Sequence, residues 1–241
     1  MKPTNLNEAT GSMATEEAVA RNDDRWPSYV VVEGPIGVGK TTLAHRLADS
    51  FGSSLLLEGA HENPFLEKFY ENPQSAALPT QLYFLLQRAR QLKELRQEDL
   101  FNPVRVADFL IEKDRLFAEL TLDEDELELY EQVYANLAMD ATKPDLVVYL
   151  QAPVEVLLER IRKRGIGYEK FIETGYLERL CDAYVQFFYQ YNDAPLLIVN
   201  AADIDFANDA ADYQLLLDRI MKNRSGRHYF NPGALKEVMS L

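Results

Sequence analysis

A glycine-rich stretch near the start of the chain restricts the fold more than any other part of the sequence. The segment 30–42 reads VVVEGPIGVGKTT. Gly34 and Gly39, with four residues between them, are followed by Lys40 and Thr41 and match the phosphate-binding loop pattern. A buried strand, a tight turn and an amphipathic helix in this order predict an α/β protein of the P-loop NTPase type.

The residue types in this loop suit the binding of a nucleoside triphosphate. Glycines let successive backbone N–H groups face a polyphosphate at the positive end of a helix. Lys40 reaches the outer phosphates, and the hydroxyl of Thr41 ligates Mg²⁺. A strand-to-helix turn without a ligand is the alternative, but strand, loop, Lys-Thr pair and helix all agree. We expect these residues to bind ATP: Gly34, Gly37, Gly39, Lys40, Thr41 and Thr42.

Composition and charge exclude several classes of partner. The formal net charge of −14 at pH 7 argues against a DNA or RNA polymer. The single cysteine, Cys181, excludes an internal disulfide and suits a reducing cytoplasm. No apolar run approaches membrane-spanning length. We therefore expect a cytoplasmic protein that binds small molecules, and neither a nucleic acid polymer nor a membrane.

The succession of apolar and polar segments predicts one folded domain. Residues 1–27 are polar and mixed in charge, which is typical of a disordered leader, and residues 223–241 read as a C-terminal tail. Between them, residues 28–222 alternate strands with helices. This order predicts a three-layer sandwich whose central parallel sheet of about five strands is covered by helices on both faces. The expected strands are 30–33, 54–58, 103–108, 145–150 and 195–200.

Two of these strands end on a carboxylate, at Glu58 and at Asp108. In open parallel sheets, ligands bind beyond the carboxyl ends of the strands. We therefore expect both carboxylates beside the phosphate loop. A kinase of a small acceptor needs a base that takes a hydroxyl proton, an acceptor pocket and a cationic lid. Asp108 is our candidate for the base.

A long helix, expected at residues 77–95, carries two polar side chains in its apolar stripe. Gln81 and Arg88, seven positions apart, fall among Leu78, Phe84, Leu85, Leu92 and Leu95. Burying an amide and a guanidinium there costs several kcal/mol unless each finds a partner. Either this stripe faces a wet edge where Arg88 extends into water, or it lines a pocket whose occupant forms hydrogen bonds. Both readings remain open from the helix alone.

A basic cluster interrupts the otherwise acidic chain. Arg160, Arg162, Lys163 and Arg164 precede Gly165. A basic helix end with a glycine cap is one explanation. The explanation we favour is a short basic lid whose arginines close over transferring phosphates.

Together, these features resemble the deoxynucleoside kinases, the family of deoxycytidine, deoxyguanosine and bacterial deoxyadenosine kinases. The resemblance covers roughly residues 28–221. It implies ATP-dependent phosphorylation of the 5′-hydroxyl of a deoxynucleoside in deoxynucleotide salvage, with Mg²⁺ as cofactor and a homodimer as a plausible assembly. A purine substrate is favoured by analogy, because the segments 62–65 and 113–115 resemble those of bacterial purine deoxynucleoside kinases.

The resemblance also implies a role for each site residue. Catalysis falls to Asp108 as general base and to Lys40, Arg160 and Arg164, which offset phosphoryl charge. The implied substrate-binding residues are Glu58 near the 5′-hydroxyl, Tyr70 at the 3′-hydroxyl, Gln81 and Arg88 at the base edge, Asp114 as partner of Arg88, and Glu169 as the lid acid that binds the sugar.

The chain departs from the family pattern at four positions. Asp108 is one methylene shorter than the glutamate that is usual in the family. Phe109 and Leu110 stand where an arginine and a serine follow the carboxylate in the family, and Ile166 replaces a third lid arginine. Arg115 is the nearby cation that we consider as a substitute. Two other functions remain as alternatives: a nucleoside monophosphate kinase of the thymidylate kinase type, and a non-catalytic P-loop module that senses nucleotides.

Overall fold

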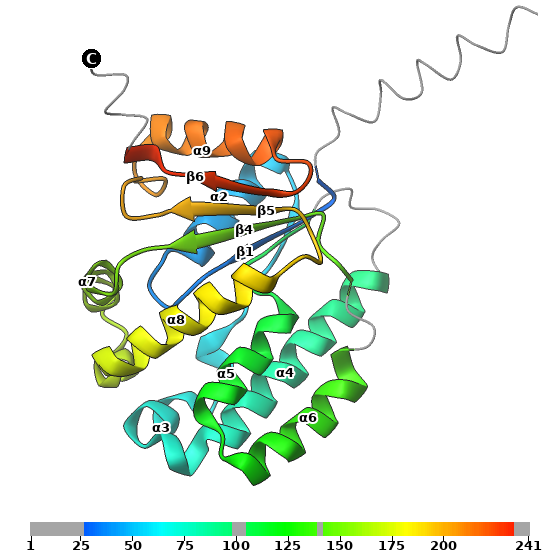
Figure 1. The fold of residues 1–241 in the computed structure, drawn as a ribbon, viewed down its shortest axis with the longest axis vertical. Helices are drawn as coiled ribbons and strands as arrows, with labels where there is room; N and C mark the ends of the chain where they lie inside the picture. The colour runs from blue at the N-terminus through cyan, green and yellow to red at the C-terminus, as the bar shows by residue number, and fades with distance from the viewer. Residues whose placement is uncertain (1–26, 98–104, 139–141, 234–241) are drawn as a thin grey trace, which may run out of the picture.

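A six-stranded parallel sheet forms the centre of the protein (Figure 1). The computed structural model describes residues 27–97, 105–138 and 142–233. The strand order is β2-β3-β1-β4-β5-β6, and all neighbouring strands pair in parallel. The strands are β1 (Tyr29–Glu33), β2 (Ser54–Leu56), β3 (Arg105–Ala107), β4 (Leu146–Gln151), β5 (Leu196–Asn200) and β6 (Arg227–Phe230).

Helices cover both faces of this sheet, which confirms the predicted three-layer α/β fold. Figure 1 shows α2 and α9 on one side and α4, α5 and α8 on the other. No helix in the described part of the chain is long and apolar enough to cross a membrane. The helices are α2 (Lys40–Phe51), α3 (Leu66–Glu71), α4 (Pro73–Gln97), α5 (Asp114–Thr121), α6 (Glu124–Ala138), α7 (Val154–Arg164), α8 (Thr174–Gln190) and α9 (Ala210–Lys222), with short 3₁₀ turns η1 (Ala60–Glu62), η2 (Ile111–Lys113) and η3 (Gly167–Phe171).

The central strand β1 is buried along its whole length. It pairs with β3 on one edge and β4 on the other, with Val31 opposite Ala107 and Val147. Helices cover both faces of the sheet, so every side chain of β1 is buried. Its three valines therefore follow one another with no polar residue between them. This packing fixes the end of β1, and therefore the start of the phosphate loop, at the carboxyl edge of the sheet.

The sixth strand lies in the segment that we assigned to a C-terminal tail. β6 pairs with the edge of β5, from Leu196 opposite Arg227 to Val199 opposite Phe230. Only Phe230 of its four residues is buried, so the sequence carries no alternating pattern that predicts a strand. The tail prediction is therefore wrong for residues 227–230. The predicted leader, apart from residue 27, and residues 234–241 of the predicted tail lie outside the described residues.

We predict that Phe230→Ala lowers the free energy of unfolding by about 3 kcal/mol, because it removes a buried ring that fastens β6. Tyr229→Ala on the same strand is the matched control: its side chain is 73% exposed, and the change should stay within about 0.5 kcal/mol. Urea unfolding measures both. Equal effects of the two changes would contradict the inclusion of β6 in the folded core.

Candidate active site

The phosphate loop joins β1 to α2 in a tight cradle. Gly34 and Gly37 have φ of +149° and +83°, a region that residues with a Cβ rarely adopt. A Cβ at Gly34 would lie 2.5 Å from the carbonyl oxygen of Leu150. Lys40 Nζ donates to the carbonyl oxygen of Gly34 at 2.8 Å, across the mouth of the loop. The cradle therefore fits a polyphosphate, with its lysine already at the loop.

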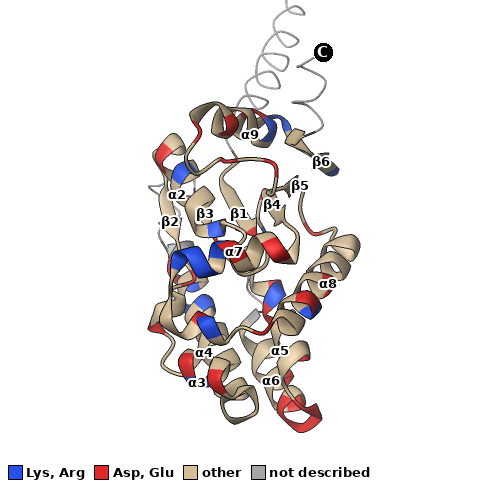
Figure 2. Cartoon of the chain, turned by 90° about the vertical axis from the view of Figure 1, so that its left-hand side faces the viewer, with Lys and Arg blue, Asp and Glu red and all other residues tan. Residues whose placement is uncertain are grey.

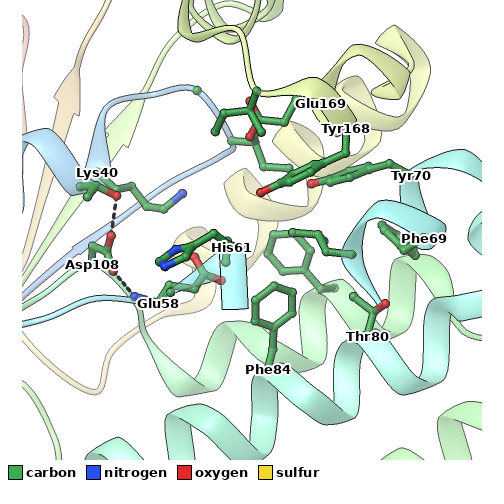
Figure 3. Close-up of a pocket in the computed structure, with 18 of the residues that line it drawn as sticks. Lys40, Glu58, His61, Phe69, Tyr70, Thr80, Phe84, Asp108, Tyr168 and Glu169 are labelled. Carbon is green, nitrogen blue, oxygen red and sulfur yellow. Dashed lines mark hydrogen bonds between the residues drawn. The ribbon is translucent and has the colours of Figure 1, made fainter. Parts of the chain in front are cut away.

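A carboxylate at the end of β3 lies against the first turn of α2. Thr41 Oγ1 donates to Asp108 Oδ2 at 2.6 Å, and the backbone N–H of Glu58 donates to Asp108 Oδ1 at 2.7 Å (Figure 3). Hydroxyl and carboxylate oxygens are the ligands that Mg²⁺ prefers. Thr41 and Asp108 could thus hold a magnesium ion beside the phosphates. Both oxygens of Asp108 are engaged in the structure.

A cavity of about 280 Å³ opens on one side of the phosphate loop. In Figure 3, Glu58 lies beside Asp108, and the aromatic rings of Phe84 and Tyr70 line the cavity farther from the loop. The ring of Tyr70 stacks on that of Tyr168, with centroids 5.9 Å apart. The cavity brings together most of the residues that the sequence predicted for substrate binding, namely Glu58, Tyr70, Gln81, Arg88 and Glu169.

Arg88 is buried in this cavity, with 3% of its surface exposed. Its guanidinium donates to Asp114, as the sequence predicted, and also to Glu58, which was not predicted. Gln81 Nε2 donates to Thr121 Oγ1 at 3.2 Å. The wet-edge reading of this helix face is therefore wrong, because the two polar side chains point into a lined pocket.

A second buried ion pair, missed from the sequence, joins the cavity to β1. Lys113 Nζ lies 3.3 Å from Glu33 Oε1 and 3.5 Å from Glu58 Oε1. Lys113 and Glu33 are 1% and 0% exposed. Glu33 is the last residue of β1 and carries a carboxylate. The same pattern led us to Glu58 and Asp108, so the sequence did indicate that Glu33 could belong to the site.

The hypothesis that Arg115 replaces the arginine absent at Phe109 is wrong. The side chain of Arg115 is half exposed, and its Nε donates to Glu131 at 2.7 Å. Phe109 is fully buried in the core. Of the cations in this turn, Lys113 is the one that lines the cavity.

Three cations, Lys113, Arg88 and Lys40, determine the charge of Glu58. Burial alone raises the pKa of a carboxyl group, but Lys113, Arg88 and Lys40 outweigh it and lower the pKa of Glu58 from 4.5 to about 2. Burial lowers the pKa of Lys40, and the nearby Lys113 adds to that shift. Glu58 is thus a carboxylate at neutral pH, and Lys113 lies within electrostatic reach of the phosphate-binding lysine.

A larger cavity of about 770 Å³ lies on the other side of the phosphate loop, against α7 and the segment 202–208. That segment follows β5 at the carboxyl edge, and we did not predict its part in a site. Figure 2 looks onto this edge and shows lysines and arginines on and around α7. Gly37, Lys40, Thr41 and Arg164 line both cavities, so the two meet at the phosphate loop.

The two predicted lid arginines have different neighbours. Arg160 donates to the carbonyl oxygens of Val38 at 3.1 Å and Ala201 at 2.8 Å, on the side of the larger cavity. Arg164 forms a two-pronged pair with Glu169, at 3.1 and 2.6 Å. The basic end of α7 therefore lies between the two cavities.

We predict that acid destabilises the wild type more steeply than Glu58→Gln. Because the pKa of Glu58 is lower in the folded state, the unfolded chain binds its proton first. The stability that Glu58 contributes is complete above about pH 4.5 and is lost as the pH falls toward about 2. Urea midpoints of both proteins between about pH 6 and pH 3 should converge; a constant difference would contradict the shift.

Comparison with known proteins identifies the family. The sequence profile described as "Deoxynucleoside kinase" matches residues 30–224. The chain belongs to the deoxynucleoside kinase family. A deoxyguanosine kinase from Bacillus subtilis (strain 168) is 38% identical over 192 residues, which are 77% of this chain and 92% of the relative. A deoxyadenosine kinase from Lactobacillus acidophilus is 30% identical over 195 residues, 75% of this chain and 88% of that protein.

The fold is also that of solved members of the family. A deoxyadenosine kinase from M. mycoides, solved with dCMP and dCDP bound, superposes with a TM-score of 0.71 at 25% identity and covers 80% of this chain and 98% of its own. A structure of the same enzyme with dATP superposes with a TM-score of 0.70. The protein is a kinase that phosphorylates nucleosides.

Proposed function

We propose that this kinase transfers the γ-phosphoryl group of ATP to the 5′-hydroxyl of a purine deoxynucleoside, in deoxynucleotide salvage. The observation that carries the proposal is the meeting of two cavities at the phosphate loop, one of which is lined by Arg88, whose guanidinium is paired with the buried Asp114. A transferase of this kind needs two substrates held end to end, with their reacting atoms at the point of contact.

The larger cavity suits the donor. We propose that the phosphate loop and Lys40 hold the phosphates of ATP, with Thr41 on Mg²⁺ and the base directed toward the segment 202–208. A Mg²⁺ ion held there would neutralise charge that develops on the phosphates during transfer. Arg160 and Arg164 would offset the charge of the moving phosphoryl group from the opposite side.

The smaller cavity suits the acceptor. The contacts of its two carboxylates, Asp108 and Glu58, favour a different role for each. Asp108 has both oxygens engaged, one of them by Thr41, so we propose that it acts on the magnesium side. Glu58 Oε1 is held by Arg88 and Lys113, and no described residue bonds its Oε2. This differs from our sequence-based hypothesis, in which Asp108 alone is the base.

In the proposed reaction, Glu58 orients the 5′-hydroxyl and receives its proton. The 5′-oxygen forms a bond to the γ-phosphorus as the bond from that phosphorus to the bridging oxygen of ADP breaks, and ADP leaves. A carboxylate with so low a pKa is a weak base, so its main contribution is orientation of the nucleophile. Tyr70 and Glu169 would hold the sugar from the far side of the cavity.

The base specificity follows from the polar groups at the inner end of the cavity. Arg88 and Gln81 offer donors and acceptors to a base edge, and Asp114 is paired with the guanidinium of Arg88. An arginine and a carboxylate in this place mismatch the carbonyl and methyl edge of thymine. The related deoxyguanosine and deoxyadenosine kinases support a purine. Phe84 lines the same cavity and can contact the face of the base.

The two alternatives account for less of the site. A nucleoside monophosphate kinase of the thymidylate kinase type must hold an anionic acceptor, and Glu58 would repel its phosphate. A nucleotide-sensing module without turnover has no use for Arg88 and Gln81 inside a second cavity.

We further propose that the protein is a cytoplasmic homodimer. Two leucines, Leu86 on α4 and Leu129 on α6, are exposed on neighbouring helices and support a helix-packed dimer of the kind that the family resemblance implies. The sedimentation coefficient of the full chain tests the assembly.

The test of the function is an ATP-consumption assay with the four deoxynucleosides and with dAMP as acceptors. We expect deoxyguanosine or deoxyadenosine to give the highest kcat/KM, thymidine to be about 10²-fold poorer, and dAMP to be inactive. A preference for dAMP would instead favour the monophosphate kinase, and ATP binding without turnover would favour the sensing module.

The division between the two carboxylates predicts different kinetics for Asp108→Asn and Glu58→Gln. Both should lower kcat by about two to four decades. Asp108→Asn should also raise the Mg²⁺ concentration that gives half the maximal rate, whereas Glu58→Gln should leave it unchanged. Magnesium titrations of the initial rate measure this. If Asp108→Asn leaves the magnesium requirement unchanged, the result would contradict a role on the magnesium side and support Asp108 as the base.

A further inference from the structure

Lys113 is a buried cation whose position no role described so far explains. Its ammonium group is 1% exposed and lies at the end of η2, where the chain enters α5. Removing an ammonium group from water costs several kcal/mol unless it is paired, and even a well-paired buried ion rarely adds net stability over an apolar side chain. A purely structural position would therefore be filled as well by a methionine or a leucine.

Neutralising Glu33 is the simplest explanation for this lysine, but it is insufficient. The carboxylate of Glu33 already accepts hydrogen bonds from Gly34 N at 2.9 Å, Leu110 N at 2.8 Å and the hydroxyl of Tyr184 at 2.9 Å. These three donors are shorter contacts than Lys113 Nζ at 3.3 Å. Lys113 is thus not needed to satisfy the oxygens of Glu33.

The second partner of Lys113 is Glu58, inside the acceptor cavity. Lys113 Nζ and Arg88 Nη2 both contact the same oxygen, Glu58 Oε1. Arg88 comes from α4 and Lys113 from η2, so two separate elements hold one oxygen of this carboxylate. The other oxygen, Oε2, has no hydrogen-bond partner among the described residues, and Glu58 lines the cavity next to Asp108.

We propose that Lys113 is a positioning residue for the phosphoryl acceptor. By fixing Glu58 Oε1, it keeps Glu58 Oε2 directed at the acceptor hydroxyl, and it supplies the buried positive charge that Phe109 does not. The proposal rests on the function proposed above, in which Glu58 contacts the 5′-hydroxyl. Lys113 acts through Glu58 in this arrangement, because its ammonium group contacts Oε1 of that carboxylate.

The experiment compares the binding of two ligands that differ only in the hydroxyl group. Calorimetry gives the Kd of 2′-deoxyguanosine and of 2′,5′-dideoxyguanosine for the full chain. In the wild type we expect the ligand with the 5′-hydroxyl to bind about tenfold more tightly, because a hydrogen bond to a charged group is lost in the other. In Lys113→Met we expect this ratio to fall to about one to three, and kcat to fall with it.

Lys113→Met leaves Glu33 with one cation fewer. If this variant does not fold, Glu33→Gln/Lys113→Met replaces it in the experiment, because the double variant removes both buried charges. Arg115→Met is the matched control, because it removes a cation two positions away whose side chain is half exposed and contacts Glu131 rather than Glu58. The proposal requires a low ratio in the folded double variant and a ratio near that of the wild type in the control. Thermal unfolding of each variant shows which ones are folded.

Three results would overturn the proposal, and each has a different meaning. A ratio near ten in the double variant would mean that Lys113 serves only to neutralise Glu33, with the proposed function intact. A wild-type ratio near one would mean that Glu58 does not contact the hydroxyl, and the proposed role of Glu58 would fall together with that of Lys113. Binding of neither ligand, with no turnover of any deoxynucleoside, would refute the function itself.

Discussion

The carboxylate of Glu33 is the contact on which the rest of the site depends. It ends the central strand β1 in the interior and accepts hydrogen bonds from the phosphate loop at Gly34, from the β3–α5 connection at Leu110 and from α8 at Tyr184. A buried carboxylate is tolerated only when its oxygens are fully satisfied. Glu33 therefore fixes three segments relative to one another. All three contribute residues to the smaller cavity, and the phosphate loop also lines the larger one.

Alternating charges continue from this carboxylate into the acceptor cavity. Glu33 contacts Lys113, Lys113 contacts Glu58, Glu58 contacts Arg88, and Arg88 contacts Asp114. Each charge has an opposite neighbour, so none is buried alone, and the row extends from the end of β1, where the phosphate loop begins, to the start of α5. The row itself holds three carboxylates and two cations, so in a chain with a net charge of −14 the positive charge beside the phosphate loop comes from Lys40, Lys163 and Arg164.

Much of the candidate site could be predicted because its residues lie near the carboxyl ends of parallel strands, where α/β sheets bind ligands. The loop motif, the acids that follow β2 and β3, and the spacing of Gln81 and Arg88 predicted residues that line the two cavities of the structure. Lys113 was missed because a lysine in a short turn carries no sequence signal for burial. Arg115, two residues later, looked equivalent in the sequence, yet it pairs with Glu131 at the surface.

The sequence by itself determined the α/β class, the phosphate loop and the order of strands and helices, because each follows from local periodicity or from a motif of adjacent residues. Only the tertiary structure decided which charges meet, since Glu33, Glu58, Arg88 and Lys113 come from four separate segments. It also decided that β6 joins the sheet, because that strand is held by backbone pairing with β5 and a single buried ring. Contacts between distant segments depend on how the layers pack, and no local pattern records them.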